Sequence, residues 1–269
     1  MEFITILLSS LLGLVSAGGL VIDRAAQKAI RSQVEVDRLY VRVDNAPSYQ
    51  LLQGKVERVR IAGRNVQLKR QGIRVAALEL ETDPINLDLR SPGQKLRLKR
   101  PFQAGVRLVL TQEHINQALQ SPEITTRLRN ILSLSSSSSI AESEQSYEFV
   151  NPSVELLENK RLRFQVELQE QGNVDLLAIT VESGLSVVTG RQIQLVEPVV
   201  SVNGEAVSNQ IVSALATQLS RQLDLSKLDK YGLQARLLKL EVGEDELVIA
   251  AFLRVEPSSR FLENISSLI

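Results

Sequence analysis

The sequence predicts an α+β fold in which curved antiparallel sheet packs on amphipathic helices. Strand-like segments alternate apolar and polar residues, so that one face of the sheet is apolar and the other is wet. Only about three helical segments are available to cover this long apolar face. Aromatic residues make up 4% of the 269 residues, so Leu, Val and Ile must fill the core. We expect a single domain; two similar subdomains joined at a serine run are the alternative.

The N-terminal segment, residues 3–22, runs for twenty residues without a charge, which is long enough to span a membrane. Val15-Ser16-Ala17 suits a signal-peptide cleavage site, whereas the positive charges follow the segment and would keep that side cytoplasmic. The orientation therefore stays open. The alternative is that residues 20–30 form a helix buried in the fold. We predict that residues 1–22 form a signal or membrane anchor that leads into an amphipathic helix.

From about Val34 the hydrophobic period changes from helical spacing to two. In "VEVDRLYVRV", Leu39 and Val41 fall on one face, and in "VRIAGRNVQL" Val59 and Ile61 do the same. Further strands are predicted in "GIRVAALELE", "INLDLR", "KLRLKR" and "GVRLVLT". These segments make the first half of the chain a sheet.

"TQEHINQALQ", residues 111–120, is predicted to open a helix with Thr111 as its N-cap. Ile115 and Leu119 stand four apart and give this helix an apolar edge. The serine-rich stretch 133–146 holds too few hydrophobic residues to pack, so it is predicted to be a loop or linker.

The second half repeats this plan in outline. "RLRFQVELQE" alternates, and "DLLAITVES", "LSVVTG" and "RQIQLVEPVVSV" continue the sheet. A helix follows, with Val207, Ile211, Ala214, Leu215 and Leu219 along one stripe. Two closing strands are joined by a hairpin turn at residues 243–245. The domain is expected to cover residues 23–255, with a tail at 256–269.

The charges balance over the whole chain but not along it. Residues 1–110 hold 18 Lys and Arg against 10 Asp and Glu, a net of +8, and the remainder holds 13 against 21, a net of −8. This distribution suggests one face suited to an anionic surface. The alternative is that both signs merely solvate outward faces.

The residues of an enzyme are scarce. There is no Cys, and the only histidine, His114, is expected to be an ordinary surface residue. No phosphate-binding loop, metal-spaced histidine pair or nucleophile elbow is present, so no cofactor and no metal are expected. A hydrolase that uses carboxylates alone is a weaker class. Strand arginines without interleaved aromatics argue against a nucleic-acid partner.

One stretch carries a resemblance to a known family. In "NAPSYQLLQGKVERVRIAG", residues 45–63, a Pro-led turn holds two leucines and stops at Gly54 before a strand. It resembles the P-x-x-x-L-L-x-G plus strand motif of the LmeA-like phospholipid-binding proteins. The similarity extends to "GVRLVLTQEHINQALQSP" and "LSVVTGRQIQL" and covers about residues 20–255.

The resemblance implies a tubular lipid-binding-like fold and a non-enzymatic phospholipid-binding protein, a carrier or assembly factor at the membrane or bacterial cell envelope. A membrane-associated adaptor with a closed core and no bound lipid is the alternative. The predicted lipid-contact residues are Pro47, Leu51, Leu52, Val59, Ile61, Leu108, Leu110, Ile115 and Leu119. Arg58, Arg60 and Arg64 are predicted to contact headgroups. Leu51 and Leu52 have an alternative role as a small lid on the core.

Overall fold

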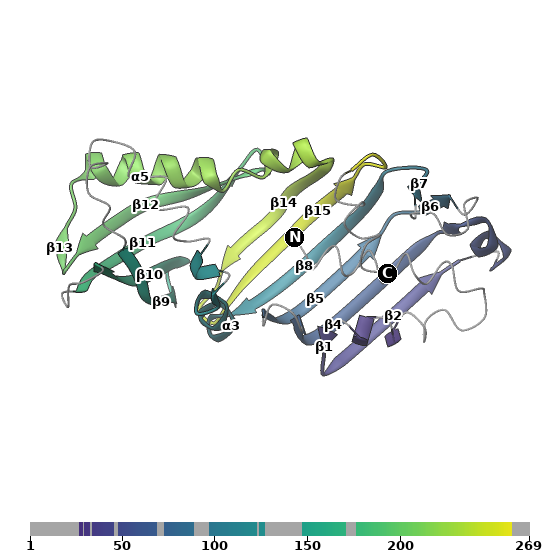
Figure 1. The fold of residues 1–269 in the computed structure, drawn as a ribbon, viewed down its shortest axis with the longest axis horizontal. Helices are drawn as coiled ribbons and strands as arrows, with labels where there is room; N and C mark the ends of the chain where they lie inside the picture. Colours follow the sequence, from purple (N-terminus) through teal and green to yellow (C-terminus); the bar gives the residue numbers. More distant parts are fainter. Residues whose placement is uncertain are drawn as a thin grey trace.

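The computed structural model describes residues 27–28, 30–32, 34–45, 48–68, 73–88, 97–122, 124–126, 147–170 and 176–259. The predicted segment 3–22, Pro47, the serine-rich loop 133–146 and residues 260–269 lie outside the described residues. Most of the described residues are in strands, which form sheets of seven, five and three strands (Figure 1). The strand pairs are antiparallel, which confirms the predicted antiparallel sheet with few helices.

The seven-stranded sheet has the order β1-β4-β5-β8-β15-β14, and β2 also pairs with β4. Its strands are β1 (Val34–Glu35), β2 (Arg38–Asp44), β4 (Arg58–Leu68), β5 (Arg74–Thr82), β8 (Phe102–Thr111), β14 (Leu233–Val242) and β15 (Glu246–Val255). The last two come from the end of the described chain: β15 lies beside β8, and Phe102 pairs with Val255. The first half of the sequence and its last two strands therefore build one sheet.

One face of this sheet, here called the inner face, is apolar. Val41, Ile61, Leu80 and Val106 form one row across neighbouring strands. The three-stranded sheet, β3 (Lys55–Val56), β6 (Ile85–Asp88) and β7 (Arg97–Leu98), shares a cluster of buried side chains with it. Of the predicted strand "KLRLKR", the described part forms β7 at Arg97–Leu98, where Leu98 is buried in this cluster.

The opposite face, here called the outer face, carries the alternate residues of the same strands. Its central row consists of Tyr40, Ala62, Glu79, Arg107 and Ala250. Over most of its area the sheet thus has an apolar side and a side lined by charged and small residues, as the alternation predicts. Near α3 the outer face is apolar instead, because Ala77, Val109 and Val248 form a small buried cluster there.

The five-stranded sheet comprises β9 (Tyr147–Leu157), β10 (Arg161–Glu170), β11 (Leu176–Val188), β12 (Gln192–Val202) and β13 (Glu205–Ala206). Helix α5 (Asn209–Gln222) packs along β12, and the 3-10 helix η3 (Leu225–Tyr231) leads back to β14. In Figure 1 this sheet lies at one end of the molecule and β2 at the other.

Helix α3 (Gln112–Leu119) connects the two large sheets. The Thr111 hydroxyl accepts a hydrogen bond from the His114 backbone N–H at 3.3 Å, which confirms the predicted N-cap. The Asn116 side chain bonds both backbone groups of Val154 on β9, at 3.0 and 2.6 Å, and the Gln112 side chain accepts from the Leu156 N–H at 2.8 Å. The side-chain amides of Gln112 and Asn116 therefore provide hydrogen-bond partners for backbone groups of β9.

Candidate functional site

Four of the predicted lipid-contact residues lie together on the inner face. Val59 and Ile61 of β4 are each 2% exposed and belong to the main cluster of buried side chains. Leu108 and Leu110 of β8 are partly buried and pack against this cluster. These side chains already have neighbours that exclude water, and their assignment to a lipid path stays a prediction.

The other predicted contacts come from α3 and from the leucine turn. Ile115 and Leu119 are partly buried on α3. Leu51 and Leu52 lie in the 3-10 helix η1 (Ser48–Gln53). Gly54, which ends the turn, has a φ of 75°, a conformation that glycine adopts without strain. Its carbonyl accepts from the Leu87 N–H at 2.7 Å, so the motif's glycine ties η1 to β6.

The three predicted headgroup arginines lie on the outer face, along β4. Arg58 pairs with Glu81 at 3.1 Å, Arg64 pairs with Glu79 at 3.5 Å, and Arg60 pairs with Asp44. Hydrogen bonds from Arg60 and then Arg42 hold the pKa of Asp44 below its usual value. All three arginines thus face solvent beside a carboxylate.

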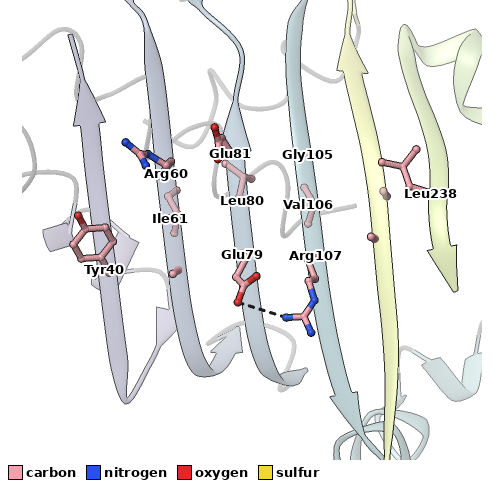
Figure 2. Close-up of a pocket in the computed structure, with 13 residues that line it drawn as sticks. Tyr40, Arg60, Ile61, Glu79, Leu80, Glu81, Gly105, Val106, Arg107 and Leu238 are labelled. Carbon is pink, nitrogen blue, oxygen red and sulfur yellow. Dashed lines mark ion pairs between the residues drawn. The ribbon is translucent and has the colours of Figure 1, made fainter. Parts of the chain in front are cut away.

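The outer face also carries a shallow hollow of about 460 Å³. Figure 2 shows Tyr40 of β2 and Leu238 of β14 on opposite sides of it, with the ion pair of Glu79 and Arg107 between them. Ala62, Gly105 and Ala250 line it as well. Sequence patterns do not indicate this hollow, because strand register brings together small residues from distant strands to form it.

The apolar face of the five-stranded sheet is the largest set of functional candidates that sequence reasoning did not name. Strand register places Phe164 opposite Val154 and Val181, and Leu168 opposite Leu177. The half-buried apolar members of this face include Leu162, Phe164, Leu168, Ile179, Val181, Leu185, Leu195 and Val202. The alternation in "RLRFQVELQE" marked this face as apolar, but periodicity does not report how fully a face is covered.

Burial separates this face from the inner face. On the five-stranded sheet Leu156, Val166 and Val200 are buried, at 7%, 3% and 7% exposure. Among the described residues, neither cluster of buried apolar side chains includes a member of this sheet. The face therefore holds apolar side chains that no described core encloses.

Helix α5 lies over part of this face. Val200 of β12 and Val212 of α5 are buried, whereas Val196 and Val199, on the other face of β12, are 39% and 57% exposed. This pattern places the helix on the apolar side of β12. The predicted helical stripe is exposed in part, because Ile211 is 55% exposed. Among the described residues, both the helix and the sheet thus keep exposed or half-buried apolar side chains.

The expectation for His114 is wrong. Its side chain is buried, at 9% exposure, where α3 packs on β5 and β8. Burial lowers the pKa of the imidazole, and the positive charge of Arg74 adds to this effect. Within the described part of the chain, Nδ1 has no hydrogen-bond partner. The polar neighbours at the start of the helix hid this burial from a sequence-based interpretation.

In the described part of the chain, α5 covers only part of the apolar face of this antiparallel sheet, and such a face suits apolar ligands. The family model described as LmeA-like phospholipid-binding matches residues 15–252, and the chain belongs to this family. The resemblance seen in the sequence is confirmed. No curated protein and no solved structure matches the chain. In the described part of the chain, no helix has the length and apolar character needed to cross a membrane.

Proposed function

We propose that the protein is a non-enzymatic phospholipid carrier or assembly factor of the cell envelope, and that acyl chains bind on the apolar face of the five-stranded sheet, beside α5. In this arrangement the sheet wraps the helix and the lipid together, as in a tubular lipid-binding fold. The half-buried state of Phe164, Leu168 and their neighbours carries the proposal. Membership of a phospholipid-binding family supports it.

The energetics favour a lipid on this face. Each methylene that leaves water contributes about 0.8 kcal/mol, so an acyl chain that covers the half-buried side chains gains affinity without polar chemistry. On the inner face Leu108 and Leu110 are only partly buried, but its β4 part offers less, because Val59 and Ile61 are already removed from water. A lipid there would have to displace packed neighbours.

The headgroup would lie near charged residues at the membrane surface. Arg58, Arg60 and Arg64 are the predicted contacts, and Pro47, Leu51 and Leu52 are the predicted apolar rim. The N-terminal segment 3–22 is the proposed route to the membrane, as a signal or an anchor. These assignments rest on the sequence and on the exposure of the three arginines.

Mass spectrometry of the purified protein after organic extraction tests the function. We expect phospholipid in a fixed ratio to protein. Protein that carries no lipid, and takes up none from vesicles, would instead support the alternative of a membrane-associated adaptor with a closed core.

A matched pair of variants on β10 tests the position of the acyl chains. Leu168→Asp places a charge on the apolar face and should strongly reduce bound phospholipid, because a carboxylate opposes contact with hydrocarbon. Gln165→Asp places the same charge on the exposed opposite face of the strand and should leave the lipid content unchanged. Circular dichroism checks that both variants fold. Equal lipid content in Leu168→Asp and the parent would move the site elsewhere.

A further inference from the structure

The outer face of the seven-stranded sheet carries a surplus of positive charge. The outward positions of β2, β4, β5, β8, β14 and β15 hold nine Lys and Arg and five Asp and Glu, whereas the whole chain holds 31 of each. β4 contributes three of the arginines, and the returning strand β14 adds Arg236 and Lys239. Residues from both halves of the sequence thus build one basic face.

Two large side chains project from this basic face into solvent. Leu238 is 70% exposed, more than any other large hydrophobic residue in the described part of the chain, and Tyr40 is 55% exposed. Leu238 is the extra residue of a β-bulge between Leu237 and Lys239, and such a residue is left out of the ladder. The bulge therefore presents an exposed leucine directly beside Lys239 on this basic face.

Between these two side chains, small residues lie beside the Glu79–Arg107 ion pair. A side chain built on Gly105 would meet nothing within 4 Å. Three alanines, Ala62, Ala250 and Ala251, also line the hollow. Tyr40 and Leu238 stand on strands five spacings apart, about 24 Å. Figure 2 shows Tyr40 on one side of the hollow and Leu238 on the other.

We propose that this outer face docks on the surface of an anionic lipid bilayer, with Leu238 and Tyr40 at headgroup depth and the basic side chains against phosphates. Basic residues near an anionic leaflet attract it, and tyrosine favours the interface because its ring is apolar and its hydroxyl is polar. The small side chains of Ala62 and Ala250 leave room for headgroups beside the Glu79–Arg107 ion pair. This inference rests on the proposed lipid-binding function but concerns a different sheet from the acyl-chain site.

The full-length chain has no cysteine, so a single introduced cysteine can carry an environment-sensitive fluorophore. Leu238→Cys and Tyr40→Cys place the probe on the docking face. Val199→Cys is the matched control, because Val199 is 57% exposed on the polar face of the five-stranded sheet. The probes report local contact, so the reading does not depend on how segment 3–22 meets the membrane.

With vesicles of phosphatidylglycerol in phosphatidylcholine, the probes at 238 and 40 should shift to the blue and the probe at 199 should not. Pure phosphatidylcholine should give a smaller shift. Adding Arg236→Glu should raise the vesicle concentration for a half-maximal shift about tenfold. Equal shifts at all three positions, or a shift at 199 alone, would overturn the docking face. A response to duplex DNA without a response to vesicles would also overturn it.

The lipid content of the same labelled proteins separates the two proposals. Bound phospholipid without a vesicle response at 238 and 40 defeats the docking face and leaves the acyl-chain site standing. A vesicle response without bound phospholipid defeats the acyl-chain site and leaves the docking face standing.

Discussion

At the scale of single residues, the imidazole of His114 is enclosed where α3 meets β5 and β8. Burial is the main cause of its lowered pKa. The positive charge of Arg74 lowers the pKa further, and the negative charge of Glu113 acts in the opposite direction. A buried histidine with no partner at Nδ1 favours the neutral form. The packing of α3 therefore favours an uncharged imidazole.

This environment makes stability depend on pH. The folded protein holds the His114 pKa below the ordinary value of 6.5, so the unfolded chain binds the proton more readily. The stability from the neutral imidazole is fully present above pH 6.5. It declines as the pH falls below 6.5, and the decline stops below the lowered pKa. His114→Gln should remove this part of the pH dependence in urea unfolding.

Because His114 is the only histidine, its ring protons give one NMR titration curve without an assignment problem. We expect a midpoint below 6.5 in the folded protein. A midpoint at or above 6.5 would mean that the ring is accessible to solvent or has a carboxylate partner, and the pH-dependent stability would then have another source.

At the scale of elements, α3 closes the edge of the five-stranded sheet. Asn116→Ala removes the amide that bonds the Val154 N–H and C=O. We expect a loss of about 1–2 kcal/mol in the free energy of unfolding, because two backbone groups of a partly buried strand lose their partner. Urea unfolding measures the loss, and faster hydrogen exchange should appear at Val154.

Gln117→Ala is the control for this change, since Gln117 is the exposed neighbour on the same helix. It should leave the stability nearly unchanged. If Asn116→Ala also leaves the free energy of unfolding unchanged, water replaces the amide at the β9 edge, and α3 contributes through packing alone.

The local elements could be predicted from the sequence because each depends on neighbouring residues. Alternation in "RLRFQVELQE" predicted β10 over its observed range, Thr111 predicted the start of α3, and Gly243 predicted the β14–β15 turn, where its N–H bonds the Glu246 carbonyl at 2.8 Å. These confirmed predictions share short-range causes: side-chain period, capping and turn conformation.

The assembly of the elements could not be predicted in the same way. Nothing in the strand "DELVIAAFLRVE" reveals that it pairs with β8, because its apolar period fits any sheet. The amides of Gln112 and Asn116 read as ordinary helix residues until β9 is placed beside them. The degree of cover over Phe164 or Ile211 depends on which elements pack there, so the candidate site emerged only from the fold.

At the scale of the whole molecule, we expect the two large sheets to have different roles. In our proposals, the seven-stranded sheet docks on the membrane, and the five-stranded sheet binds the acyl chains. Reversing Arg58 and Arg60 to Glu should weaken binding to anionic liposomes at low salt and leave bound phospholipid unchanged. The Arg58–Glu81 pair is exposed and the Arg60–Asp44 pair is partly exposed, and such pairs contribute little to stability, so the variant should stay folded. Parent binding should also fall as salt rises, because the attraction is screened over about 8 Å at physiological ionic strength.

Arg163→Glu with Arg221→Glu is the matched reversal on the other part of the molecule, with the same change of charge. Liposome co-sedimentation, taken as the difference between anionic and neutral vesicles, compares the two variants. Equal losses would show that net charge alone, and not the outer face, governs the attraction.

The pairing of β8 with β15 has a consequence for how the chain is made. While a ribosome is still adding residues, β2, β4, β5 and β8 are already synthesised, but the strand that covers β8 arrives only with residues 246–255. Until then β8 is an unprotected edge with an apolar side, and closing the sheet requires a contact between distant parts of the sequence, which is slow. The ribosome synthesises the whole five-stranded sheet after β8 and before β14 and β15. Nascent chains that stop before β14 are thus the form of this protein most exposed to aggregation and to capture by chaperones.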